Sequence, residues 1–237
     1  SDLNKKDKAL ENINKAMKIY KDVGREDKLA ESLVSLGTFY RKFGKLDLAI
    51  ENYQQSLRLQ RKFKNFKSIA LTLQDMGVTY LNKGDTGKAL DFYEKAQKIY
   101  KDQSDESGYM EALKDIANVY SQIGQYGKAI EIFKSYLEYS KKEKYDFGIY
   151  SSYLEIGDIY SNWTRYDTAL NYYEQALEIN ERFDPHSREA NHGTVFVAMG
   201  YDYLHLGKID KALEYLSSAL EISKKSGDKG NVANILR

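Results

Sequence analysis

The chain has 237 residues and no cysteine, which excludes disulfides, thiol catalysis and thiolate metal sites. Its 36 Lys and Arg nearly balance 35 Asp and Glu, so no sequence-wide field favours nucleic acid as a partner. The longest apolar stretch, residues 194–201, is far shorter than the roughly 20 residues that span a bilayer. We therefore expect no nucleic-acid partner and no membrane association for this segment. The composition leaves the compartment open, and a cytoplasmic location is favoured.

Two short signatures alternate along the chain. The first is a small residue followed three positions later by tyrosine, as in Gly37 and Tyr40; its copies stand 40 residues apart, except the last, which follows after 43. The second is an alanine, found at Ala9, Ala49, Ala89, Ala129, Ala169 and Ala212. Because a fixed step of this length characterises stacked structural units, the pattern predicts one array of helical repeats.

In chain order, we expect a half repeat at 5–24, full repeats at 28–64, 68–104, 108–144, 148–184 and 188–226, and the start of a further repeat at 228–237. Each full repeat is two helices separated by a break at Gly44, Gly84, Gly124, Thr164 or Gly207. Glycine can adopt the left-handed conformation that closes a helix, and Thr164 is the one departure from this pattern. Acids in the first turn of the second helix are expected at Asp7, Asp47, Asp167 and Asp210. Because both terminal repeats are cut, we expect the chain to be an excerpt from a longer protein.

The repeated residues also predict how the two helices of a repeat pack. The small residue at Gly37 and its equivalents allows a close approach of the second helix. Four residues after each repeated alanine, that helix carries a large side chain at Tyr53, Tyr93, Phe133, Tyr173 and Leu216. Generic amphipathic helices would not repeat the same small residue at a fixed step, and the glycines interrupt any coiled-coil heptad pattern.

These residues resemble the tetratricopeptide repeat. The match rests on Leu33, Leu36, Gly37, Tyr40, Ala49, Tyr53 and Leu57. The usual proline after the second helix is absent, Ser56 and Tyr136 replace the second alanine, and the 40-residue step is similar to the longer repeats of bacterial signalling regulators and animal polarity adaptors. The resemblance implies an all-α superhelix that serves as a protein- or peptide-binding scaffold, the sensing or adaptor region of a larger bacterial signalling protein. The alternative is a structural scaffold whose exposed terminal repeats stack on copies of themselves.

The resemblance also implies that the first helices line a concave groove that holds the ligand. Carried over by position, the peptide-binding candidates are Arg41, Lys42, Gln74, Asp75, Asn82, Lys114, Asp115, Asn118, Gln122, Glu155, Asp158, Asn162 and Tyr201. Asn118 is the strongest of them, because similar adaptors carry there an asparagine that binds the ligand's main chain. The charges run from basic residues to acidic ones, which favours a ligand with a basic stretch and an acidic end. The alternative for each residue is an ordinary solvated helix face.

Other polar clusters receive structural interpretations. The basic run Arg58, Arg61, Lys62, Lys64 and Lys67 suits the exposed end of a second helix. His186 and His192 stand near Asp184, but Pro185 is expected to place them around a loop that carries the three extra residues of the longer step, so we predict no metal site. Neither a phosphate-binding glycine motif nor a nucleophile motif is present, so we predict no cofactor and no enzymatic activity.

Overall fold

The computed structural model describes residues 2–227, 230, 232 and 235, the first four by their backbone alone. Every regular element among these residues is an α-helix, which confirms the predicted all-α class. The chain divides into two compact units, residues 1–119 (unit 1) and residues 120–237 (unit 2). None of the described helices is both long enough and apolar enough to cross a membrane.

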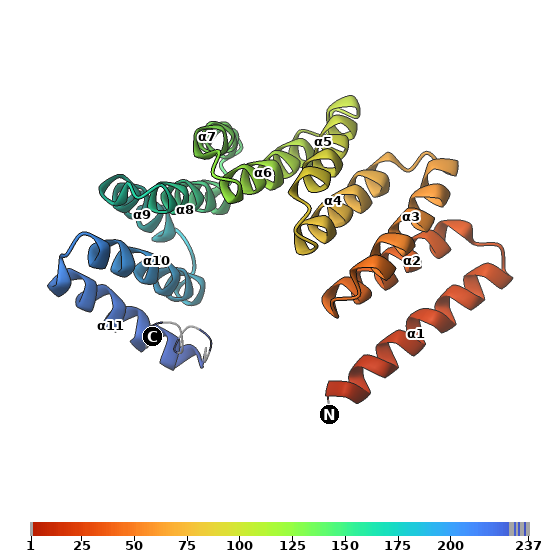
Figure 1. Ribbon diagram of the computed structural model, residues 1–237, viewed down its shortest axis with the longest axis horizontal. Coiled ribbons are helices and arrows are strands. Elements are labelled where there is room, and N and C mark those ends of the chain that lie inside the picture. Colours follow the sequence, from red (N-terminus) through yellow and green to blue (C-terminus); the bar gives the residue numbers. More distant parts are fainter. Residues whose placement is uncertain (1, 228–229, 231, 233–234, 236–237) are drawn as a thin grey trace. The chain divides into compact units, whose positions relative to one another are not determined.

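Unit 1 consists of helices that pack in chain order (Figure 1). They are α1 (Asp2–Asp22), α2 (Glu26–Lys42), α3 (Leu46–Lys62), α4 (Phe66–Asn82), α5 (Thr86–Asp102) and the larger part of α6 (Glu106–Gln122). Helices α2 and α3 form one pair, α4 and α5 the next, and α3 packs against α4. Each pair therefore buries its side against the next pair, as the repeat predicts.

Unit 2 continues the same arrangement of pairs. Its helices are α7 (Tyr126–Lys142), α8 (Asp146–Asn162), α9 (Tyr166–Asn180), α10 (Pro185–His205) and α11 (Ile209–Ser226). Helix α8 pairs with α9 and α10 with α11, while α10 also contacts α9 and α8. Apolar side chains from α7 to α11, among them Leu170, Val195 and Met199, form one buried cluster. This core fixes the positions of the first helices α8 and α10 within the unit.

The turns at the predicted glycines have the predicted conformation, since the backbone angle φ is positive at Gly44, Gly84, Gly124 and Gly207. Thr164, the departure from the glycine pattern, adopts the same conformation with a φ of 58°. After the left-handed Gly44, the Lys45 amide donates to the Tyr40 carbonyl at 2.9 Å, which closes the end of α2. Three turns between pairs use the same conformation without glycine, at Lys64, Ser104 and Lys144, whereas the turn between α9 and α10 contains no residue with positive φ.

The small residue of the first signature lies directly beneath the large side chain of the second helix. A Cβ atom added to Gly37, Gly77 or Gly157 would lie 2.5–2.6 Å from a ring carbon of, respectively, Tyr53, Tyr93 and Tyr173. These three rings are fully buried. Glycine is therefore required at these positions by the close approach of the two helices, which confirms the predicted packing.

Two local expectations are wrong. Asp47, Asp167 and Asp210 do stand in the first turn of a second helix, but Asp7 lies inside α1, which already begins at Asp2. Pro185 begins helix α10 and does not place the histidines around a loop. A proline suits this position because its missing N–H has no partner in the first turn.

The longer step of the last repeat is absorbed by helix α10. The carboxylate of Asp184 caps it by accepting from the amides of His186 and Ser187, both at 3.1 Å. Helix α10 has 21 residues, whereas α8 has 17, so His186 and His192 both lie on a helix. No group of three metal-ligating side chains occurs among the described residues.

The helix pairs define where each repeat lies in the chain. They begin at Glu26, Phe66, Glu106 and Asp146, two residues before the predicted starts at 28, 68, 108 and 148, and at Pro185, three residues before the predicted start at 188. The further repeat predicted at 228–237 lies for the most part outside the described residues.

Candidate functional site

Polar side chains connect the three first helices of unit 1. Arg41 of α2 donates from Nη2 to Oδ1 of Asp75 on α4 at 3.3 Å, and Gln74 of α4 donates from Nε2 to Oδ2 of Asp115 on α6 at 2.8 Å. All four side chains are half-buried. The structure therefore brings together, on one surface, four residues predicted from the sequence. We call the surface formed by the first helices of a unit its first-helix face: α2, α4 and α6 in unit 1, α8 and α10 in unit 2.

The side-chain amide of Gln74 is held at both ends. Its Oε1 atom accepts from the Tyr100 hydroxyl of α5 at 2.8 Å, while its amide nitrogen donates to Asp115. Burial raises the pKa of Tyr100 to about 12. Burial also raises the pKa of Asp115, and the hydrogen bond from Gln74 opposes that rise. The second helix thus positions a polar group of the first-helix face through a buried tyrosine.

Charges on this face are largely compensated within it. Burial raises the pKa of Asp75, and the nearby Arg41 guanidinium opposes that rise. Arg41, at the basic end of the predicted charge gradient, and Asp75, its first acidic residue, therefore form an ion pair with each other. Lys114 pairs with Glu111 at 2.5 Å, whereas Lys42 and Asn82 are exposed.

Asn118 differs from its neighbours on the face of unit 1. Its side chain is half-buried, and among the described residues its amide makes no hydrogen bond. At the equivalent position of α2, the Thr38 hydroxyl contacts the Tyr53 hydroxyl at 3.1 Å. The Asn118 amide therefore keeps both a donor and an acceptor for another molecule.

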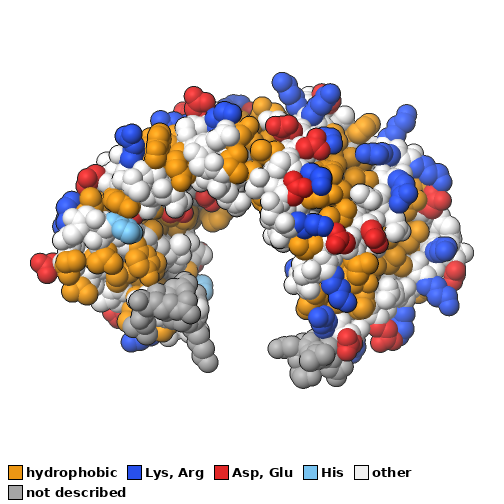
Figure 2. Space-filling model, in the orientation of Figure 1, with side chains coloured by type: hydrophobic (Ala, Val, Ile, Leu, Met, Phe, Trp, Pro, Cys, Tyr) orange, Lys and Arg blue, Asp and Glu red, His pale blue; other side chains and the backbone are white. Residues whose placement is uncertain are grey.

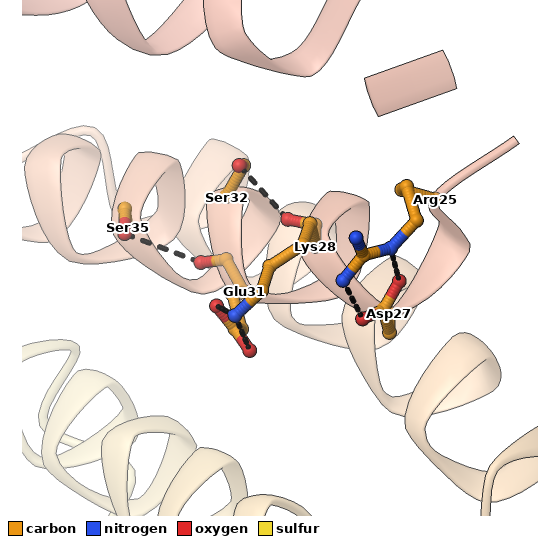
Figure 3. Close-up of polar contacts among 6 residues, drawn as sticks. All are labelled: Arg25, Asp27, Lys28, Glu31, Ser32 and Ser35. Carbon is orange, nitrogen blue, oxygen red and sulfur yellow. Dashed lines mark hydrogen bonds and ion pairs between the residues drawn. The ribbon is translucent and has the colours of Figure 1, made fainter. Parts of the chain in front are cut away.

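The beginning of α2 shows a different kind of surface (Figure 3). Lys28 pairs with Glu31 at 2.8 Å and Arg25 pairs with Asp27 at 2.7 Å, all within two or three residues along the chain. These pairs are exposed and link no helices. Charges of both signs are mixed over the visible face of unit 1 (Figure 2). Exposed ion pairs elsewhere in unit 1, such as Lys62 with Glu26, also join two helices, but the contacts of Arg41 and Gln74 differ from them in being half-buried.

In unit 2, two carboxyl groups lie on the first-helix face. Asp158 of α8 accepts from the Tyr173 hydroxyl of α9 at 2.8 Å. Asp202 of α10 accepts from the Ser161 hydroxyl of α8 at 2.5 Å. Burial, and secondarily the charge of Asp202, raise the pKa of Asp158 to about 6 against the hydrogen bond from Tyr173. Burial also raises the pKa of Asp202.

The remaining predicted residues of unit 2 lie nearer to solvent. Glu155 is half-buried on α8, one turn from Asp158. Gln122 at the end of α6 and Asn162 at the end of α8 are exposed, and Tyr201 on α10 is 37% exposed. Glu155 and Asn162 thus share helix α8 with Asp158, and Tyr201 shares α10 with Asp202, whereas Gln122 lies on a different helix.

Sequence reasoning missed four groups that build these faces: Tyr100, Ser161, Tyr173 and Asp202. The tyrosines were interpreted as packing residues, and only the structure shows where their hydroxyls point. Asp202 did leave a signal, because the equivalent positions hold Phe39, Thr79, Val119 and Ile159. An acid in a series that is otherwise uncharged and mostly apolar indicates a special environment.

A hollow among the described residues lies elsewhere in unit 2. It measures about 760 Å³ and runs between α7 and α9, with Lys134, Lys141, Tyr153 and Tyr172 on its walls. None of the peptide-binding candidates lines it. Its lining comes mainly from the second helices α7 and α9, with Tyr153 contributed by the first helix α8.

Comparison with protein families decides the membership of this chain. The sequence profile of the tetratricopeptide repeat matches residues 3–62 and 68–142, and a second tetratricopeptide repeat profile matches residues 150–183 and 194–226. The chain belongs to the tetratricopeptide repeat family. A search of curated proteins finds no match.

Solved structures with the same fold include several helical-repeat proteins. BtubC (BKLC) from P. vanneervenii is 19% identical with a TM-score of 0.80, over 94% of this chain and 92% of that protein. Aspartyl phosphate phosphatase F from Bacillus subtilis is 21% identical with a TM-score of 0.77, over 92% of this chain and 57% of that one. A Rap protein complexed with Competence and Sporulation Factor is 18% identical with a TM-score of 0.70, over 89% and 57%. At these identities the likeness establishes the tetratricopeptide-type solenoid fold alone.

Proposed function

We propose that this tetratricopeptide repeat protein binds a peptide or an extended protein segment on its first-helix faces and acts as a scaffold without catalytic chemistry of its own. The observation that carries the proposal is the side chain of Asn118, a half-buried amide that makes no hydrogen bond to the described residues. A peptide backbone presents one donor and one acceptor per residue, and a carboxamide can pair with both.

The neighbours of Asn118 support this role because they are already fixed. Gln74 and Asp115 are bonded to each other, and Tyr100 holds Gln74 from the second helix. A binding surface whose polar groups are held in place loses less conformational entropy when a ligand arrives. The first-helix face of unit 1 is thus preorganised, and the Asn118 amide on it is available to form hydrogen bonds with a ligand.

The comparisons add support for a sensing or adaptor role. One structural neighbour is a Rap protein complexed with Competence and Sporulation Factor, and this chain spans 57% of its length. By analogy, we infer that the chain recognises its ligand as part of a signalling protein. Fold likeness alone carries this step, so the ligand must be found by experiment.

A selection from a random 12-residue peptide library would test peptide binding. We expect peptides that bind the full chain, and we expect the variant Asn118→Ala/Lys114→Ala to weaken the best of them at least tenfold, since each lost hydrogen bond at such a site contributes about 1 kcal/mol. Fluorescence anisotropy with the labelled peptide gives the affinities.

The matched control is Gln55→Ala/Lys98→Ala, which removes an amide and an ammonium group from exposed positions on the second helices α3 and α5. This control should bind like the parent chain. Equal weakening by both double variants, or none by either, would contradict binding at the first-helix face of unit 1.

Self-association is the second candidate function, and it is favoured by the surface of α11. Leu213 is 62% exposed and Ile209 is 51% exposed, whereas Leu170, the equivalent of Leu213 in the preceding pair, is 6% exposed. Leu170 is covered by the pair that follows it. A second copy of the chain could cover α11 in the same way.

Sedimentation velocity separates this candidate from peptide binding. If copies associate through α11, the sedimentation coefficient should rise with protein concentration and Leu213→Glu should abolish the rise, because a buried unpaired carboxylate opposes association. A concentration-independent monomer would remove self-association and leave peptide binding as the function.

A further inference from the structure

Asp158 and Asp202, which we call the acidic pair, lie on helices α8 and α10 of unit 2, and among the described residues neither forms an ion pair with a lysine or arginine. Asp202 is only 1% exposed. Its Oδ1 atom accepts from Ser161, but its Oδ2 atom is buried and has no hydrogen-bond partner. A buried carboxyl oxygen without a partner is energetically costly, so native proteins rarely leave one in place without a reason.

Other acids on the first-helix face of unit 1 are compensated within that face. Asp75 faces the Arg41 guanidinium, and Asp115 accepts from Gln74 with Lys114 nearby. No lysine or arginine of the described residues forms an ion pair with Asp158 or Asp202. The one basic group that acts on the pair is His205, whose charge would lower the pKa of Asp202 and whose ring stacks on Tyr166 at 4.8 Å.

We propose that the acidic pair is a subsite for a cationic group of the bound peptide, the guanidinium of arginine or the ammonium of lysine. This inference rests on the proposed function, since it names the chemistry that the first-helix face of unit 2 would recognise. Asp158 is half-buried and therefore reachable from solvent, while Asp202 lies behind it as the second negative charge.

An organic cation fits the geometry better than a metal ion does. The described residues contain no group of three metal-ligating side chains, and the pair offers only two carboxyl groups. A guanidinium has five N–H donors in a planar fork, so it can engage more than one carboxylate oxygen. In a partly desolvated site such charge-assisted hydrogen bonds are stronger than in water.

The titratable groups around the pair determine how binding responds to pH. The titratable groups that act on Asp158 are Tyr173 of α9, Asp202 of α10 and Tyr150 of its own helix. Tyr150 stays neutral, because burial and the charge of Asp158 raise its pKa to about 12. His205 acts on Asp202. A cation binds the ionised pair, so its affinity should increase as the pH rises through about 6, the pKa of Asp158.

Two blocked pentapeptides test the proposal: Ala-Ala-Arg-Ala-Ala, and the same peptide with citrulline, which has nearly the shape of arginine but no charge. Each is titrated into the isotope-labelled full chain at millimolar concentration, and the amide signals of residues 158–162 and 199–205 are followed by nuclear magnetic resonance. We expect saturable shifts with at least roughly tenfold tighter binding of the arginine peptide, in keeping with a charged hydrogen-bond pair.

Two variants keep the test specific. Asp158→Asn should abolish the preference for arginine over citrulline, whereas Asp167→Asn, an exposed carboxyl on α9, should leave it unchanged. The preference should also fall when the pH is lowered from 7 to 5. Equal binding of both peptides, absence of binding by either, or an unchanged preference in Asp158→Asn would overturn the proposal.

The outcome is distinguishable from failure of the proposed function. Library peptides that depend on Asn118 but show no preference for a cation would retain peptide binding and remove the subsite. Arginine-dependent chemical-shift changes at the acidic pair, with no effect of the Asn118 substitution on peptide binding, would support the subsite. They would contradict peptide binding on the first-helix face of unit 1.

Discussion

Gly157→Ala is expected to destabilise unit 2 by about 2–4 kcal/mol, because overpacking a filled core is costly. The added Cβ would lie 2.5 Å from Cε1 of Tyr173. That ring is 1% exposed, and its hydroxyl donates to Asp158, so it cannot move away without losing the hydrogen bond. Urea unfolding followed by fluorescence is the suitable measurement, since Trp163 is the single tryptophan of the chain and lies in unit 2.

Gly127→Ala is the matched control for this substitution. Gly127 stands on α7 in the same unit, and a Cβ added there would meet nothing within 4 Å. The control should be neutral or more stable by a few tenths to about 1 kcal/mol, because alanine has the higher helix propensity. If the two variants unfolded at the same urea concentration, the close packing of α8 under Tyr173 would be wrong.

Unit 2 should become more stable as the pH falls from about 7 to about 5. The folded-state pKa of Asp158 is raised to about 6 by burial and by Asp202, above the ordinary value of 3.8. Between these two values the folded chain holds more protons than the unfolded chain, so the free energy of unfolding declines as the pH rises through that window. The part due to Asp158 is on the order of 2 kcal/mol.

Thermal unfolding of the parent chain and of Asp158→Asn at several pH values measures this contribution. The neutral amide can still accept from the Tyr173 hydroxyl but does not titrate, so the variant should lose most of the pH dependence and should be the more stable protein at pH 7. Asp202, whose pKa is also raised, would contribute the remainder in the same direction. A parent chain that gains stability from pH 5 to pH 7 relative to the variant would refute the burial of an uncompensated Asp158.

The fold could be predicted largely because its packing depends on residues that repeat. Gly37 and Tyr53 recur as Gly77 and Tyr93, and only glycine allows the ring to pack so closely on the first helix. The turn at Gly44 could be predicted in the same way, because glycine adopts a positive φ without strain. The turns at Lys64 and Ser104 have the same conformation but no sequence signal, because the neighbouring helices impose it on residues that do not favour it.

The candidate site could be predicted only in part. Position within the repeat predicts that Arg41, Asp75 and Asn118 lie on the first helices. It does not predict which of these side chains form hydrogen bonds or ion pairs within the chain. Whether Arg41 reaches Asp75 or solvent depends on rotamers and on the spacing of α2 and α4, to which the repeat pattern is insensitive. Position within the repeat predicts Asp158 as a site residue but not Asp202, although the equivalents of Asp202 along the chain are uncharged and mostly apolar.

The side-chain amide resonance of Asn118, recorded while the best peptide from the library is added to the full chain, tests most directly whether the first-helix face holds the ligand. We predict a large saturable shift of that resonance, accompanied by shifts of residues on α2 and α4 and little change on α3 and α5. Shifts confined to the second helices, or to the hollow between α7 and α9, with Asn118 unmoved, would contradict the account.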